Sequence, residues 1–129
     1  MSSHFAAELV NKFEHNRKAL PAIALNDMAN ITSIANDRDY ASVFSRQIEA
    51  LGKPDDILII FTTSEPMPYK DRAEGYNHSL NVVFAEETAK EMGIKVFYAP
   101  RIEDSTAAIQ EFQLEWMHQL CREIEQAFI

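Results

Sequence analysis

Two patterns of hydrophobic residues alternate along the chain, and they predict helices and strands in turn. Spacings of three or four predict helices over residues 4–13, 31–37, 40–51, 79–92 and 105–128. Short apolar runs predict buried strands at Ala22–Leu25, Ile57–Phe61 and Val96–Ala99. Ser2 or Ser3 is a candidate N-cap for the first helix. The last helix is expected to turn one hydrophobic set inward: Ile109, Phe112, Trp116, Leu120, Ile124 and Phe128.

This alternation is typical of an α/β fold, and it predicts a three-layer α/β/α sandwich around a mostly parallel sheet. The 129 residues suit a single domain. Three strands are few beside the mean of about 5–6 for a sheet. The domain is therefore either shortened or completed by another chain. Between the second strand and the next helix, Thr62–His78 has no period and is expected to be a long, functional loop.

Composition narrows the possible functions. The net charge of −8, from 12 basic and 20 acidic residues, argues against direct binding of nucleic acid. Three glycines allow no glycine-rich phosphate loop. A single cysteine excludes an internal disulfide and suits a reducing cytosol. The longest apolar run has five residues and no signal peptide is evident, so we expect a cytoplasmic protein with no membrane partner.

Two pairs of polar residues on predicted helices are candidates for chemistry. His4 and Glu8 are four residues apart and so share a helix face, where they could bind a divalent metal or act as an acid–base pair. A solvated ion pair is the ordinary alternative. Gln110 and His118 lie about 12 Å apart along the last helix, which is long for two ligands of one ion. A buried or interface histidine is the alternative there.

Hydroxyl groups gather where the central strand ends. Thr62, Thr63 and Ser64 follow that strand, and Ser79 precedes the next helix, so these side chains could bind a phosphate. Capping and turn formation are equally good explanations. Asp37 is a possible helix cap. Lys12 could contact a phosphate or simply face solvent.

Several segments resemble the bacterial phosphoheptose isomerases. These segments are His4–Val10, Pro21–Leu25, Ile34–Asp37 and Phe44–Gln47, and the similarity continues over most of the chain. The family consists of sugar isomerase (SIS) domain proteins. They convert sedoheptulose 7-phosphate to heptose 7-phosphate for the lipopolysaccharide core. The resemblance implies an SIS-type fold and an aldose–ketose isomerase acting on a sugar phosphate.

The resemblance also implies a site and an assembly. His4, Glu8, Gln110 and His118 match the family's zinc-binding and catalytic positions, with Glu8 as the base and His118 as the acid. Asp37 matches an active-site aspartate, and Thr63 and Ser64 match a phosphate-binding loop. Family members are homotetramers whose sites lie between subunits, so a homo-oligomer is implied.

The chain also departs from the family pattern. We expect a single SIS-like domain over 1–129 that lacks the family's N-terminal helix, first strand and glycine-rich loop. About a dozen residues from Glu65 to Gly75 are inserted in the phosphate loop, where Glu65 replaces a glycine. One alternative is a non-catalytic SIS module that binds a sugar phosphate or a protein partner such as the replication initiator. Another is a fragment that a partner chain completes.

Overall fold

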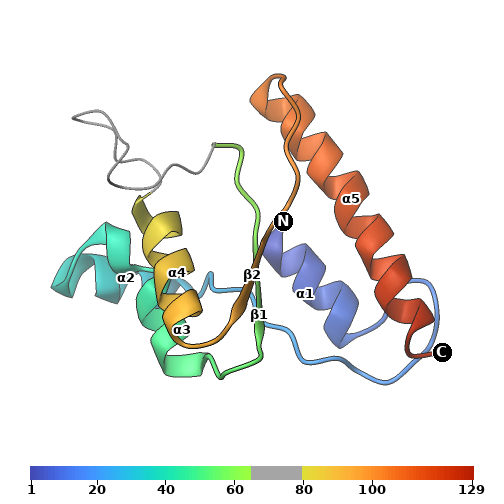
Figure 1. The fold of residues 1–129 in the computed structure, drawn as a ribbon, viewed down its shortest axis with the longest axis horizontal. Coiled ribbons are helices and arrows are strands. Elements are labelled where there is room, and N and C mark those ends of the chain that lie inside the picture. The colour runs from blue at the N-terminus through green and yellow to red at the C-terminus, as the bar shows by residue number, and fades with distance from the viewer. Residues whose placement is uncertain (65–79) are drawn as a thin grey trace. The chain divides into compact units, whose positions relative to one another are not determined.

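A computed structural model describes residues 1–64 and 80–129 (Figure 1). Ser79 and the predicted loop beyond Ser64 lie outside the described residues. The chain divides into two compact units, unit 1 (Met1–Ala24 and Ala99–Ile129) and unit 2 (Leu25–Tyr98). The elements in chain order are α1 (Ser2–Val10), α2 (Met28–Asp37), the 3₁₀-helix η1 (Tyr40–Ser42), α3 (Ser45–Leu51), β1 (Ile57–Ile60), α4 (Leu80–Glu91), β2 (Lys95–Tyr98) and α5 (Thr106–Gln126).

Unit 2 is built around two parallel strands. β1 pairs with β2 in a register that runs from Ile57 opposite Lys95 to Ile60 opposite Tyr98, which confirms the predicted parallel pairing. Ile60 is buried whereas Ile57 is exposed, so the expectation that this strand is covered throughout holds only at its carboxyl end. The apolar core beside the sheet is formed by Ile48 of α3, by Ala85 and Ala89 of α4, and by Ile94, which directly precedes β2.

Local capping explains where the helices of unit 2 begin and end. The Asp27 carboxylate accepts a hydrogen bond from the backbone N–H of Asn30 and starts α2. The predicted helix over 40–51 is divided into η1 and α3, which corrects the prediction. Asp39 accepts bonds from both the backbone N–H and the hydroxyl of Ser42, and this tight turn precedes α3. α3 ends at Leu51, where the predicted helix ends, and Gly52 is its C-cap.

The strand predicted at Ala22–Leu25 is absent, so that prediction was wrong. Ile23 is 69% exposed instead of buried. The carbonyl of Leu25 accepts a hydrogen bond from the Gln47 side-chain amide at 3.2 Å. In a β-sheet this carbonyl would instead accept from the backbone N–H of a neighbouring strand. Leu25 still packs against the core of unit 2. This apolar run is therefore a connection without strand structure, and the Gln47 side chain pairs the carbonyl of its last residue.

Unit 1 contains α1 and α5. α1 starts at Ser2 with Met1 at the N-cap and no side-chain cap, so the predicted serine cap was wrong. Ser105 caps α5 by accepting from the backbone N–H of Ala108. The buried residues of α5 recur every four positions and are not the predicted set: Ile109, Gln113, Met117, Cys121 and Glu125.

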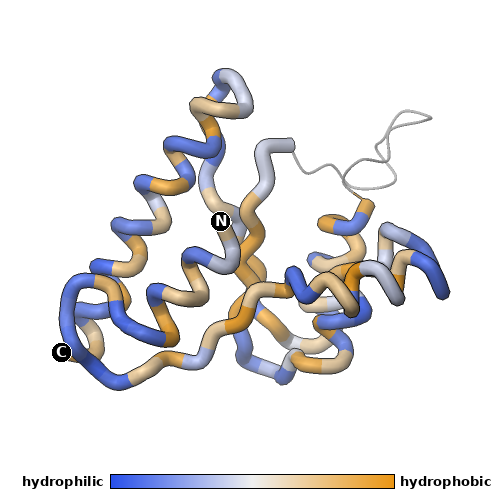
Figure 2. Tube along the Cα trace, turned by 180° about the vertical axis from the view of Figure 1, so that it is seen from behind, coloured by the Kyte–Doolittle hydropathy of each residue, from blue (hydrophilic) through white to orange (hydrophobic). Residues whose placement is uncertain are grey.

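The predicted inward stripe of α5 was therefore only partly right. Ile109 is buried, but Phe112 and Phe128 are exposed. Figure 2 shows hydrophilic residues interleaved with hydrophobic ones along this helix. Two of the five buried residues are polar, Gln113 and Glu125, so a search for apolar periodicity finds the wrong face. Among the described residues, no helix has the length and apolar character needed to cross a membrane.

Candidate functional site

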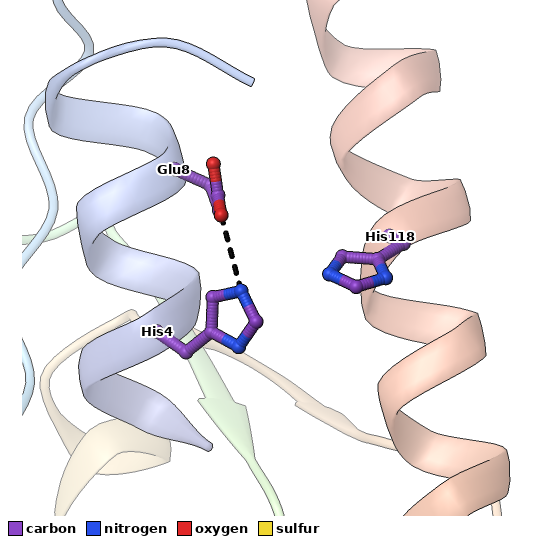
Figure 3. Close-up of side chains that lie close together, drawn as sticks. All are labelled: His4, Glu8 and His118. Atoms are coloured by element: carbon purple, nitrogen blue, oxygen red, sulfur yellow. Dashed lines mark hydrogen bonds and ion pairs between the residues drawn. The ribbon is translucent and has the colours of Figure 1, made fainter. Parts of the chain in front are cut away.

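Three polar side chains of unit 1 converge between α1 and α5. His4 and Glu8 come from α1, and His118 comes from α5 and faces them (Figure 3). One potential ligand atom from each residue lies within 4.8 Å of the other two. His4 Nε2 and Glu8 Oε1 are 3.0 Å apart, within hydrogen-bonding distance. The pairing follows from the sequence, because residues four apart share one face of a helix.

The site is partly open to solvent. The side chains of His4 and Glu8 are 44% and 23% exposed, and His118 is half-buried. Glu8 is paired with His4 through one oxygen, and within the part of the chain that the structure describes its second oxygen is available to take up a proton or bind a ligand. The arrangement can therefore bind a small polar molecule and exchange protons with it.

The ring of His118 is held by other rings. Phe13 stacks on it with a centroid separation of 5.2 Å and an interplanar angle of 23°. His4 meets it edge-on, also with 5.2 Å between centroids. The Arg122 guanidinium lies 5.5 Å from the centroid of Phe13 and pairs with Glu14 at 3.0 Å. These contacts fix the imidazole beside Glu8.

A buried charge network joins the carboxyl ends of α1 and α5. Arg17 donates hydrogen bonds to the carbonyls of Glu8 and Leu9, at 2.7 and 2.8 Å. These carbonyls belong to the last turn of α1, where they have no partner within the helix. Arg17 Nε lies 3.3 Å from Glu125 Oε1, and the two side chains are 0% and 1% exposed. This approach is an ion pair without a hydrogen bond, since Arg17 Nε has no hydrogen-bond partner in residues 1–64 and 80–129.

Glu125 anchors the segment that follows α1. Its two carboxylate oxygens accept hydrogen bonds from the backbone N–H groups of Phe13, Glu14 and His15, at 2.7, 3.0 and 3.1 Å. Burial alone would raise the pKa of Glu125. The three backbone N–H groups and the charge of Arg17 outweigh that effect and lower the pKa below its usual 4.5. Glu125 is therefore ionised at neutral pH.

The chemistry of the three converging residues suits zinc. Two histidines and a carboxylate are a ligand set found in catalytic zinc sites, where a fourth position stays open for water or substrate. Two ligand atoms bound tetrahedrally at 2.0–2.2 Å lie roughly 3.3 Å apart. The 3.0 Å separation of His4 and Glu8 is close to that value. Small side-chain rotations would bring all three residues to one ion.

Cys121 is unsuited to join them as a thiolate. Burial raises its pKa from 9.0 to about 11, and the charges of Glu8 and Glu125 add to that rise. The charges of Arg17 and Arg122 oppose the rise without reversing it. The thiol therefore remains protonated at neutral pH and acts as an apolar packing residue.

The remaining predicted site residues lie elsewhere. Gln110 is exposed in the first turns of α5, about 12 Å along the helix axis from His118. Lys12 is exposed just after α1. Asp37 ends α2 and accepts a hydrogen bond from the side chain of Asn36. Ser79 lies outside the described residues.

The hydroxyl-rich segment after β1 belongs to unit 2. Thr62, Thr63 and Ser64 are half-buried. The backbone N–H of Ser64 donates to the hydroxyl of Thr62 at 3.1 Å. The segment therefore forms the local turn that its composition predicts. Its place after the carboxyl end of a parallel strand is where α/β folds bind ligands.

Three residues that support the site were not singled out from the sequence. Phe13 was expected inside the helix predicted over 4–13, but α1 ends at Val10, so that helix is shorter than predicted. Arg17 was not assigned, although an arginine shortly after a helix is a known signal for binding its last carbonyls. Glu125 was expected on a solvated face of the last helix, and its exposure of only 1% shows that this expectation was wrong. Glu125 lies seven residues after His118, and thus on the same face of α5. That spacing was the available signal.

Comparison of the sequence with known proteins matches the same family in each case. The SIS domain family matches residues 1–97. The phosphoheptose isomerase of Thermodesulfovibrio yellowstonii is 40% identical over 96% of this chain and 64% of its own length. The phosphoheptose isomerase of Paramagnetospirillum magneticum is also 40% identical, over 96% of this chain and 67% of its own length. The chain thus spans about two thirds of the length of these curated relatives.

Solved structures agree with the sequence relatives. A phosphoheptose isomerase from Francisella tularensis matches 96% of this chain and 69% of its own, with a TM-score of 0.80 and 33% identity. One from Neisseria gonorrhoeae matches 97% and 69%, with a TM-score of 0.79 and 28% identity. These matches confirm the predicted SIS-type α/β fold class. The chain therefore belongs to the SIS domain family and, within it, to the phosphoheptose isomerases.

Proposed function

We propose that this protein is a metal-dependent aldose–ketose isomerase that converts sedoheptulose 7-phosphate to heptose 7-phosphate. The convergence of His4, Glu8 and His118 is the observation that supports this most strongly. Isomerisation needs a base to remove a proton from carbon and an acid to serve the neighbouring oxygen. A carboxylate facing an imidazole provides both groups.

Zinc is the proposed metal, with His4, Glu8 and His118 as its ligands in unit 1. When bound, it would supply a positive charge that polarises the carbonyl of the sugar. One oxygen of Glu8 pairs with His4, so the carboxylate can serve a ligand role and a base role through different oxygens. Gln110 is the proposed fourth ligand. Its distance along α5 from His118 suggests that a second copy of the chain would provide it.

The proton transfers follow from these positions. Glu8 removes a proton from the hydroxyl-bearing carbon beside the carbonyl while His118 gives a proton to the carbonyl oxygen, which yields an enediol. Protonated Glu8 then returns its proton to the former carbonyl carbon. The other enediol hydroxyl gives its proton to His118 as the aldehyde forms. Both residues end in their starting states, so the cycle needs no redox partner.

Substrate binding is proposed for the remaining predicted residues. Thr62, Thr63 and Ser64, with Ser79, would contact the phosphate through hydroxyl and backbone N–H groups, which are suitable donors for an anion. Lys12 would add a positive charge. Asp37 would accept hydrogen bonds from sugar hydroxyls.

The setting of the reaction is also part of the proposal. We place the protein in the cytoplasm, in heptose synthesis for lipopolysaccharide, and as a homo-oligomer. Ile57 and Phe97 lie on one face of the two-stranded sheet and are both exposed, which favours a further protein surface there. Light scattering on the purified chain tests this, and a monomer would contradict it.

Turnover of sedoheptulose 7-phosphate tests the catalytic proposal. The wild-type chain should convert it when zinc is present and lose that activity to a chelator. Glu8→Gln should lower kcat by about 10²–10⁴-fold, which is the usual contribution of an acid–base group. His118→Gln should have an effect of the same order.

Glu49→Gln is the matched control, because Glu49 is an exposed helical carboxylate paired with Arg46. It should keep wild-type kcat. A folded, zinc-loaded wild-type chain without turnover would overturn the catalytic proposal and favour a non-catalytic binding module.

A further inference from the structure

The imidazole of His118 is oriented by an unusual means for a metal ligand. Such histidines commonly donate their second N–H to a carboxylate or carbonyl, which fixes the ring. Within the described residues, neither ring nitrogen of His118 has a hydrogen-bond partner. The His118 ring instead contacts the stacked ring of Phe13 and the edge of His4. Ring contacts therefore do the orienting here, and among the described residues both ring nitrogens are left open to a ligand.

The position of Phe13 is in turn set by Glu125. The backbone N–H of Phe13 donates to Glu125 Oε1 at 2.7 Å, the shortest of the three bonds that this carboxylate accepts. Glu125 follows His118 by seven residues, about two turns of α5. The same helix face thus carries both the imidazole and the group that holds the stacking ring in place.

Arg17 extends this support to α1. Its guanidinium donates to the carbonyl of Glu8, which is itself a site residue, and to that of Leu9. It also forms the buried ion pair with Glu125. A planar guanidinium binds several acceptors at once in a fixed geometry, which a lysine cannot reproduce. One network therefore links the backbone of Glu8 on α1 to the stacking partner of His118.

We infer that Phe13 is a positioning residue that orients His118. Glu125 holds the backbone of Phe13, and Arg17 holds the end of α1, so that the Phe13 ring stays stacked on His118 beside Glu8. The inference rests on the proposed function for the metal that the oriented residues bind. None of the three residues contacts the reacting atoms. Their effect should appear in the affinity of the site for zinc.

Zinc affinity is measured by competition with a chromophoric chelator, under conditions in which circular dichroism shows each variant folded. Phe13→Leu keeps a hydrophobic side chain but removes the stacked ring, and should weaken zinc binding on the order of 10-fold, as changes around metal ligands do. Phe13→Tyr restores a ring and should restore the affinity to within about twofold of wild type. Glu125→Gln and Arg17→Lys should also weaken binding.

Phe112→Leu is the control, because it removes an exposed aromatic ring from α5, the helix that carries His118. It should leave zinc affinity unchanged. A role in packing alone would lower the Tm of metal-free Phe13→Leu without changing the affinity of its folded form, and that result would overturn the inference. A folded wild-type chain that binds no zinc would overturn the proposed metal site itself.

Discussion

The two units of this chain are stabilised by different interactions. The core of unit 2 is apolar, with Ile48 and Ile94 packed against small alanines of α4. In unit 1, a buried ion pair and a set of backbone hydrogen bonds join the end of α1 to the end of α5. Apolar packing is non-directional, whereas hydrogen bonds require particular angles and distances.

This difference matches the roles of the units in the proposed chemistry. The catalytic candidates of unit 1 must hold a carboxylate and two imidazoles within a few ångströms, and directional polar contacts supply that order. Unit 2 supplies a strand end and a turn, for which an apolar core suffices. The comparison implies that unit 1 is destabilised most by removal of a buried charge. Unit 2 is destabilised most by an added atom that its tightly packed core cannot accommodate.

Removing Arg17 should have the largest effect on stability. Arg17→Met leaves Glu125 buried without its cationic partner, and breaking one side of a buried pair costs about 3–5 kcal/mol. Chemical denaturation in urea measures the change in the free energy of unfolding. Arg46→Met in unit 2 is the control and should cost at most about 1 kcal/mol, because the Arg46–Glu49 pair is half-exposed. Equal losses for the two variants would contradict the proposed contrast.

Adding a methyl group to the packed interior of unit 2 should have an intermediate effect on the stability of the fold. A Cβ added at Gly52 would lie 2.7 Å from Ile94 Cδ1 and 2.8 Å from the carbonyl oxygen of Ile48. Because the backbone oxygen cannot turn aside, Gly52→Ala should cost about 2 kcal/mol, within the range for overpacking. A Cβ at Gly93 would make ordinary van der Waals contacts with Pro54, at 3.6 and 3.8 Å, so Gly93→Ala is strained through its φ of +78° and should cost about 1 kcal/mol. Thermal unfolding of both variants should rank them in this order.

The smallest effect is expected at Glu86 in unit 2. Partial burial would raise its pKa, but hydrogen bonds from Lys90 and Tyr98 and the charge of Lys90 outweigh it and lower the pKa below 4.5. A lowered pKa stabilises the fold above pH 4.5, and that gain disappears as the pH falls through the folded-state value. Glu86→Gln should therefore destabilise by less than about 1 kcal/mol at pH 7. At acidic pH below the folded-state pKa, wild type and variant should converge, and a difference that persists there would contradict the assignment.

The sequence predicted the features that rest on local periodicity. The helical spacing of His4 and Glu8 predicted that these two residues would pair. The apolar runs predicted the two strands of the sheet. Resemblance to a family added His118 as their partner, because sequence spacing alone cannot show that residues 110 apart converge.

The features that sequence reasoning missed depend on side chains meeting across the fold. The run Ala22–Leu25 has strand composition, but it forms no strand, and the carbonyl of Leu25 is bound by the side chain of Gln47. The buried face of α5 includes Glu125, which an apolar pattern excludes. Glu125 is stable there only because three backbone N–H groups and Arg17 surround it, and no local window of sequence contains all of these groups.

Deuterium exchange tests most directly the claim that Glu8 removes the proton at this site. The zinc-loaded chain is incubated with sedoheptulose 7-phosphate in D₂O, and deuterium on the carbons next to the carbonyl is followed by NMR. We expect the wild-type chain to introduce deuterium there and Glu8→Gln to introduce it at least about 100-fold more slowly. Exchange by Glu8→Gln at the wild-type rate would show that another group is the base.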